Sequence, residues 1–220
     1  MYAHAFAYQL RKGMNLGLAE TGFRIENFIA PLPETARRQG VARLQTGLKG
    51  EAIMRQGDAA DTVFILETGL VKLVYSTAAG DEWIKSFIVD RGIFGSVDTG
   101  QLEEPSRFGA QCIEASDCVL LPRAWARQAI TADAGLTSAY FAYSAWLQRR
   151  KEAREEMLLC QSPEQSYRNF LLQNDELAGR LPQGDIARYL GITPVAFSKI
   201  KRRMNVSPTL VSPLPVNQNE

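Results

Sequence analysis

The alternation of hydrophobic and polar residues changes period twice along the chain. Between residues 41 and 122, apolar positions recur every second residue in short runs, which glycine or aspartate–glycine clusters separate. Runs of this length and spacing are typical of an all-β sandwich or barrel. No helix-length pattern interrupts them, which argues against a parallel α/β sheet. The expected strands lie at residues 52–54, 62–66, 70–75, 83–89, 109–113 and 118–121.

Helical periodicity precedes and follows this β region. The four helical segments lie at residues 18–38, 123–131, 135–159 and 162–173. The first combines a helix with a turn in which Pro31 and Pro33 are expected to act as breakers. The third has no proline or glycine past Gly135 and would be about 37 Å long. The fourth begins with Ser162 as N-cap and Pro163 as first helical residue.

One face of the long predicted helix is apolar and aromatic in its first half and charged in its second. Core packing explains such a stripe, and so does a partner helix. We expect a partner helix, because one long helix beside a small barrel would otherwise leave this face exposed. The residues assigned to dimerisation are Leu136, Tyr140, Tyr143 and Leu147.

Residues 182–204 predict a helix-turn-helix. Gly191 supplies a tight turn between two short helices, Ile192 fills their junction, and Thr193 and Pro194 begin the second helix. At about 100° per residue, one side of each helix is apolar. The residues expected to face inward are Ile186, Ala187, Leu190, Phe197, Ile200 and Met204.

The opposite side of the second helix is small, hydrogen-bonding and positive. Residues 179–204 carry six basic side chains against Asp185 alone, whereas the whole chain has a net charge of only +1. This concentration is expected at a polyanion contact, although the solvated outside of a simple helical hairpin is also often charged. Such a helix suits the major groove of DNA, which is roughly 12 Å wide. The residues assigned to DNA binding are Arg188, Thr193, Pro194, Val195, Ser198, Lys199, Lys201, Arg202 and Arg203.

Composition excludes several other classes of protein. No apolar run approaches the roughly 18–20 residues that span a bilayer, and the N-terminal charges follow the apolar stretch, so a cytoplasmic protein is expected. Cys112, Cys118 and Cys160 form no Cys-x-x-Cys pair and are predicted to be small buried hydrophobes. With His4 as its single histidine, the chain lacks the residues of a catalytic triad or a histidine-rich metal centre. No enzyme, no metal site and no particular cofactor are predicted.

The arrangement resembles the Crp-Fnr family of bacterial transcription regulators. Residues 49–61 and 64–73 resemble the family's β-roll, and residues 92–95 resemble the start of its phosphate-binding cassette. Residues 185–200 resemble its helix-turn-helix. The resemblance covers about residues 25–204 in the family's order.

This resemblance implies an α+β fold. It consists of an N-terminal antiparallel β-roll (a double-stranded β-helix or jelly roll) with flanking helices, a long dimerisation helix and a C-terminal winged-helix-like helix-turn-helix domain. The implied domains are a sensor at 1–131, the dimerisation helix at 132–160, the DNA-binding domain at 161–204 and an extended or disordered tail at 205–220. The tail contains three prolines, which argues against the family's β-hairpin wing.

The implied effector pocket departs from that of the family's cyclic-nucleotide binders. Ser96 stands where they place a glutamate, and Phe108 follows Arg107, which aligns with their phosphate-binding arginine. The loop between carries three carboxylates, which repel a phosphate. Binding of cAMP is therefore not expected, and the pocket is either empty or reshaped for another small ligand. The residues assigned to it are Phe94, Gly95, Ser96, Val97, Arg107, Phe108 and Arg154.

The expected function is that of a DNA-binding transcription regulator. A homodimer would present two recognition helices about 34 Å apart to a roughly palindromic site. A small-molecule effector is an expected partner, and so is RNA polymerase if the protein is an activator. The alternative is a ligand-binding or protein-interaction module with a vestigial helix-turn-helix. The effector and the operator sequence do not follow from the residues.

Overall fold

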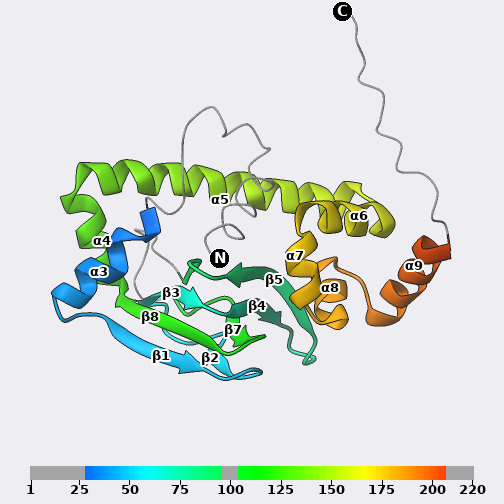
Figure 1. Ribbon diagram of the computed structural model, residues 1–220, viewed down its shortest axis with the longest axis horizontal. Helices are drawn as coiled ribbons and strands as arrows, with labels where there is room; N and C mark the ends of the chain where they lie inside the picture. Colours follow the sequence, from blue (N-terminus) through cyan, green and yellow to red (C-terminus); the bar gives the residue numbers. More distant parts are fainter. Residues whose placement is uncertain (1–27, 96–103, 207–220) are drawn as a thin grey trace, which may run out of the picture.

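The computed structural model describes residues 28–95 and 104–206, with side chains up to residue 204 in the last helix. Predictions for residues 1–27, for Ser96 and Val97, and for residues 207–220, including the wing, lie outside the described residues. In Figure 1 a β-roll lies along one side of a long helix, and a group of shorter helices lies at the far end. No helix within the described part of the chain is both long and apolar enough to cross a membrane.

Antiparallel strands form a roll of two four-stranded sheets. One sheet has the order β1-β8-β3-β6 and the other β2-β7-β4-β5. The strands are β1 (Arg43–Gly47), β2 (Ala52–Met54), β3 (Thr62–Thr68), β4 (Leu70–Ser76), β5 (Glu82–Val89), β6 (Ile93–Gly95), β7 (Gly109–Cys112) and β8 (Ser116–Pro122). The chain therefore has the α+β jelly-roll architecture that the family resemblance implied.

All six predicted strands are confirmed, with ends that differ by at most two residues. Two further strands were not predicted. β1 lies at the edge of its sheet and is mostly exposed, so its sequence shows no apolar alternation. β6 has only three residues, too few to show a period.

The interior of the roll is apolar. The rings of Phe64 and Phe94 stack with their centroids 4.9 Å apart. Cys112 and Cys118 are buried as predicted, and burial raises the pKa of Cys118 to about 12. The prediction of burial is wrong for Cys160, which is exposed because it ends the long helix away from the roll.

Pro31 and Pro33 begin a helix, and helical residues 28–29 end at a turn directly before them. α3 spans Pro31–Arg38, with Pro31 at its first position, where a missing N–H leaves no hydrogen bond unmade. The prolines therefore mark the predicted helix break, but the residues that follow it form a second helix, because proline is favourable at a first helical position. α4 (Arg123–Ala132) confirms the short helix after the roll.

The next two helices begin at well-defined N-caps. α5 spans Ala134–Cys160, and the Asp133 carboxylate accepts a hydrogen bond of 2.7 Å from the Leu136 N–H. α6 spans Pro163–Gln173, where Ser162 and Gln165 form a capping box. Both helices confirm the predicted ranges to within one residue.

The face of α5 that was assigned to dimerisation packs against the chain's own core. Tyr143 is buried and stacks on Phe28 at 5.0 Å, and Tyr140 lies 5.7 Å from the same ring. Leu136 and Leu147 are partly buried in this cluster. The prediction that Tyr143 faces a partner helix is therefore wrong, because Phe28 and neighbouring apolar side chains fill the space between α5 and the roll, whereas Leu136, Tyr140 and Leu147 stay partly exposed.

Three helices follow α6. They are α7 (Asp175–Arg180), which was not predicted, α8 (Gln183–Tyr189) and α9 (Pro194–Val206). Their core includes an edge-to-face contact of 4.8 Å between Tyr167 and Phe197. The same hydrophobic cluster contains Leu70 and Ile113 of the roll, so the C-terminal helices pack directly on the roll.

Candidate functional site

The helix-turn-helix has the local geometry that its sequence predicts. Gly191 has φ +73°, a conformation that favours glycine, and a Cβ there would lie 3.0 Å from Leu158. The Thr193 hydroxyl accepts a hydrogen bond of 3.2 Å from the Ala196 N–H and so caps α9. Ile192 is partly buried at the junction of the two helices. These contacts fix α9 relative to α8.

α9 has one buried and one exposed face. Phe197 and Ile200 are buried against α6 and α8, and Met204 is partly buried beside them. The residues on the exposed face include six of those predicted to bind DNA, namely Thr193, Pro194, Val195, Ser198, Lys199 and Arg202. The face predicted to bind DNA is therefore open to solvent.

The exposed face of α9 carries one apolar side chain together with cations. Val195 is 67% exposed. The Ser198 hydroxyl donates a hydrogen bond of 3.0 Å back to the Pro194 carbonyl, which leaves its lone pairs facing outward. Among the residues that the structure describes, no carboxylate lies within ion-pair distance of Lys199 or Arg202. A polyanion would find these two charges unneutralised.

Two other predicted DNA contacts already have partners in the protein. Arg203 pairs with Glu164 of α6 at 3.1 Å, and Arg188 pairs with Asp185 at 3.4 Å. The Arg203 side chain is nevertheless 71% exposed. Both guanidinium groups stabilise the helical domain, which sequence patterns alone did not indicate.

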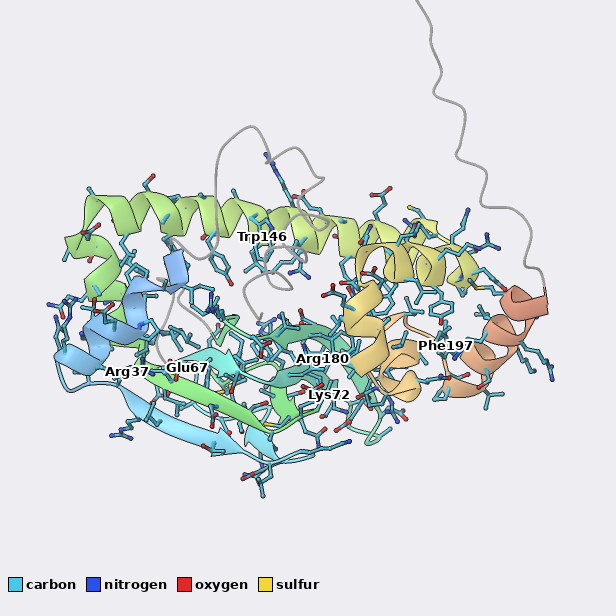
Figure 2. The ribbon with its side chains drawn as sticks, in the orientation of Figure 1. Arg37, Glu67, Lys72, Trp146, Arg180 and Phe197 are labelled. Carbon is cyan, nitrogen blue, oxygen red and sulfur yellow. The ribbon has the colours of Figure 1, made fainter. Side chains whose placement is uncertain are left out.

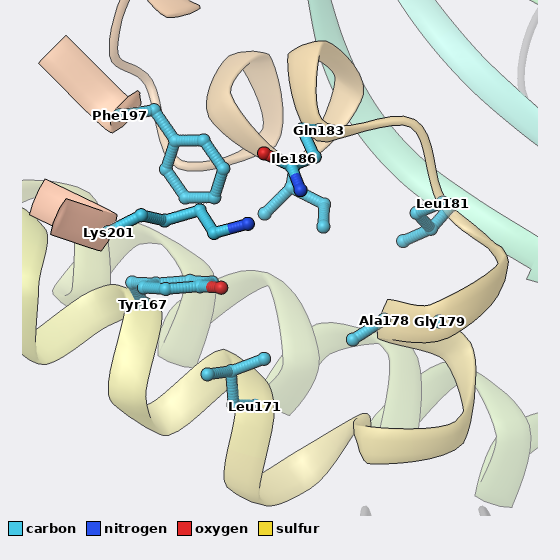
Figure 3. Close-up of a pocket in the computed structure, with 9 residues that line it drawn as sticks. All are labelled: Tyr167, Leu171, Ala178, Gly179, Leu181, Gln183, Ile186, Phe197 and Lys201. Carbon is cyan, nitrogen blue, oxygen red and sulfur yellow. The ribbon is translucent and has the colours of Figure 1, made fainter. Parts of the chain in front are cut away.

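Lys201 lies on the inner side of α9. It is partly buried and lines a cavity of about 250 Å³ between the C-terminal helices. In Figure 3 its side chain extends between Phe197 and Tyr167. Burial raises the pKa of the Tyr167 hydroxyl. Lys201 was predicted to lie beside the DNA-reading face. The structure instead places it on the inner side of α9.

Two ion pairs join the roll to the helix-turn-helix domain. Lys72 of β4 pairs with Asp185 of α8 at 3.1 Å, with both side chains buried, and Arg180 pairs with Glu114 at 2.6 Å. Figure 2 places Lys72 and Arg180 where the roll meets α7 and α8. Sequence reasoning missed both pairs. The available signal was Lys72 itself, a charged residue inside an apolar strand.

An aromatic and cationic contact lies beside these pairs. Tyr189 of α8 packs 5.3 Å from Phe87 of β5, and the Arg154 guanidinium lies 3.8 Å from the centroid of the Tyr189 ring. Arg154 also donates a hydrogen bond of 3.3 Å to the Ile84 carbonyl. Burial lowers the pKa of Arg154. Arg154 thus bridges β5 and α8, which its assignment to the effector pocket did not anticipate.

The described residues of the roll that were assigned to the effector pocket differ in their exposure. Phe94 is buried in the roll core, and Gly95 ends β6 with φ +95°. The Arg107 side chain is 85% exposed and lies 4.0 Å from the Glu104 carboxylate. Phe108 is partly buried. An outward arginine beside a carboxylate does not form the phosphate clamp of a cyclic-nucleotide binder.

The sequence of residues 45–133 matches the cyclic nucleotide-binding domain family. This segment comprises most of the roll together with α4. No curated protein matches the chain.

Several solved structures share the fold over most of the chain. FixK2 from Bradyrhizobium japonicum is 25% identical, with a TM-score of 0.66 over 76% of this chain and 85% of its own. A CooA variant from Carboxydothermus hydrogenoformans is 14% identical, with a TM-score of 0.65 over 77% and 79%. The c-di-GMP-responsive regulator CLP from Xanthomonas campestris is 12% identical, with a TM-score of 0.63 over 78% and 90%.

These three proteins are Crp-Fnr family regulators. The likeness covers 76–78% of this chain. Together with the domain match over residues 45–133, this likeness supports a Crp-Fnr-type regulator.

Proposed function

We propose that the protein is a transcription regulator, not an enzyme, and that it binds double-stranded DNA through α9. The observation that carries this proposal is the exposed face of α9, where Lys199 and Arg202 have no carboxylate partner among the described residues. A helix of this kind enters the major groove, and its cations neutralise phosphates. Crp-Fnr homologues bind DNA, form dimers and bind small effectors.

Base recognition would rest on two residues of this face. The Lys199 ammonium can donate to guanine O6 and N7, although as a point charge and not as a bidentate fork. The exposed Val195 methyl groups suit contact with a thymine methyl. Arg202 would then contact phosphates. Arg203 would do the same if its ion pair with Glu164 breaks.

The dimer would form through the outward face of α5. Phe141 on this face is 66% exposed. Exposed positions recur four and three residues apart, which is the spacing of a coiled-coil seam. They are Ala134, Ser138, Phe141, Ala145 and Gln148. Because most of these side chains are small, two copies of α5 could approach closely and set their recognition helices about 34 Å apart on a palindromic site.

Regulation would act through the contact between the sensor and the DNA-binding domain. We assign residues 1–131 to the sensor, 132–160 to the dimerisation helix, 161–204 to the DNA-binding domain and 205–220 to a tail. Tyr189 of α8 packs on Phe87 of β5, so a ligand that moves β5 also moves α8. The change would be absorbed near residues 160–163, where α5 ends and α6 begins. RNA polymerase would be a partner if the protein activates transcription.

Electrophoretic mobility shift with DNA from upstream of its own gene tests the proposal. Binding should be saturable and resistant to competitor, and raising the salt concentration from 50 to 200 mM should weaken it by about 1000-fold or more. Lys199→Ala should weaken the free energy of DNA binding by about 1–3 kcal/mol and relax the preference for particular bases. The matched control is Arg127→Ala, an exposed arginine of α4, which should bind as the unchanged protein does.

The opposite results would favour the alternative, a ligand-binding or protein-interaction module with a vestigial helix-turn-helix. Weak binding to any duplex, without salt dependence, is one such result. The other is a complete absence of binding that persists after cyclic nucleotides and cell extract are added. Equal losses on specific and random duplexes for Lys199→Ala would limit Lys199 to a phosphate contact.

A further inference from the structure

Cations gather where β5 faces the middle of α5. Lys85 extends from β5, and its Nζ lies 4.5 Å from the centroid of the Phe108 ring. The charges of Arg150 and Lys151 on α5 act on it from the facing helix. Arg154, one helical turn further along α5, bonds to the backbone of Ile84 beside Lys85. Three side chains of α5 and one of β5 thus bring positive charge to the same place.

Lys85 is partly buried, and no ion pair with a described residue neutralises it. Burial is the main reason that its pKa falls to about 8, and the nearby cations Lys151 and Arg150 lower it further. Within residues 28–95 and 104–206, no carboxylate lies in ion-pair distance of the ammonium. Lys72, the other lysine of this sheet, is more deeply buried and pairs with Asp185 at 3.1 Å. A desolvated ammonium lacking such a partner destabilises the fold unless a ligand supplies the charge.

We propose that Lys85 anchors the effector, and that the effector is a small organic anion. Its carboxylate or phosphate would lie between Lys85 and the α5 cations Arg150 and Lys151, and its apolar part would rest on Phe108. This inference rests on the proposed function and specifies the ligand of that regulator. The anchor differs from the one expected from the sequence, because Arg107 points outward beside Glu104.

Pyridoxal 5′-phosphate, an aromatic anion with an aldehyde, is a direct probe of this site. Its aldehyde condenses with an unprotonated amine to give an imine and water, and borohydride reduces the imine to a secondary amine that peptide mass spectrometry locates. With limiting reagent at pH 7.5, Lys85 should carry at least about ten times the label of Lys49, an exposed lysine of the roll. A lower pKa leaves far more free amine at this pH.

Two comparisons show whether the anion itself is recognised. Millimolar inorganic phosphate should suppress the labelling of Lys85 and leave that of Lys49 unchanged. Pyridoxal, which lacks the phosphate, should label Lys85 about tenfold less. The proposal is overturned if the label follows exposure among the seven lysines of the chain. It is also overturned if pyridoxal labels Lys85 as well as its phosphate does.

Substitutions provide a second measurement that does not depend on imine formation. Pyridoxal phosphate should raise the melting temperature of the unchanged protein and of Lys85→Arg, which keeps the charge, but not that of Lys85→Met. Equal shifts in all three proteins would overturn the proposal. DNA binding is measured on the same samples. If the protein binds DNA but the label is indiscriminate, only the proposal of an anion site is rejected. If labelling depends on phosphate but the protein does not bind DNA, only the proposal of a DNA-binding regulator is rejected.

Discussion

Lys72 and Asp185 lie 113 residues apart in the chain and form an ion pair of 3.1 Å that is buried between β4 and α8. Asp185 has a second partner, Arg188, at 3.4 Å, whereas Lys72 has no other carboxylate partner among the described residues. The two ends of the pair are therefore unequal. Loss of Asp185 leaves a buried ammonium alone, but loss of Lys72 leaves a carboxylate that still has an arginine.

Asp185→Asn should lower the free energy of unfolding by about 3–5 kcal/mol, because it strands the Lys72 ammonium in the interface. Lys72→Met should cost less, and the double variant should cost less than the sum of both. Urea unfolding of the three proteins measures this cycle. The control is Arg37→Met, which removes the exposed Arg37–Glu67 pair and should change stability by less than about 1 kcal/mol. Additive losses in the cycle would show that the pair is not coupled.

The second interdomain pair predicts a dependence of stability on pH. The hydrogen bond from Arg180 lowers the pKa of Glu114 below its ordinary value of 4.5. Because the folded state holds the carboxylate in its charged form, the pair stabilises the fold above that pH, and this contribution is lost as the pH falls through the folded pKa. Arg180→Gln should lower the melting temperature at pH 7 and make its decline toward pH 3 shallower.

Thermal melts at intervals between pH 7 and pH 3 test this expectation. Arg127→Gln, which removes an exposed arginine of α4, should follow the unchanged protein throughout. A constant difference between Arg180→Gln and the unchanged protein at every pH would contradict the assignment, because it would make the role of Arg180 independent of the charge on Glu114.

The features that local sequence determines were predicted well. The turn at Gly191, the caps at Ser162 and Thr193 and the length of α5 each depend on residues within a few positions of one another. Their steric and hydrogen-bonding requirements therefore appear directly in the sequence. The same holds for the buried face of α9, whose period identifies Phe197 and Ile200 as core residues.

Features that depend on distant contacts were missed. No local pattern shows that Lys72 will meet Asp185, or that Arg154 will stack on Tyr189. The aromatic stripe of α5 fits an internal and an external partner equally well, and only the position of Phe28 decides between them. A sequence period specifies which residues share a face, but it does not specify what that face contacts.

The two faces of α5 predict opposite consequences of substitution. Tyr143 is buried against Phe28, so Tyr143→Ala should lower the free energy of unfolding by about 3–5 kcal/mol. Phe141 faces outward, so Phe141→Asp should leave the fold intact but convert the dimer to a monomer in analytical ultracentrifugation. Phe141→Leu is the control and should remain dimeric. A dimeric Phe141→Asp protein would assign the interface to another surface.

The unpaired charge of Lys85 predicts that a substitution can stabilise the protein. Below pH 8 the lysine is charged in the folded and the unfolded chain, and only the folded chain bears the cost of its burial. Lys85→Met should therefore raise the free energy of unfolding at pH 7 by about 1–4 kcal/mol. Between pH 8 and 10.5 the folded state has released the proton that the unfolded state still binds, so the stability of the unchanged protein rises with pH.

Urea unfolding at pH 7 and pH 9.5 should show the advantage of Lys85→Met shrinking, while Lys49→Met differs little from the unchanged protein at either pH. A Lys85→Met protein that is less stable at pH 7 would mean that a carboxylate of the chain already neutralises the ammonium, and a site with its own counter-charge would not need an anionic ligand.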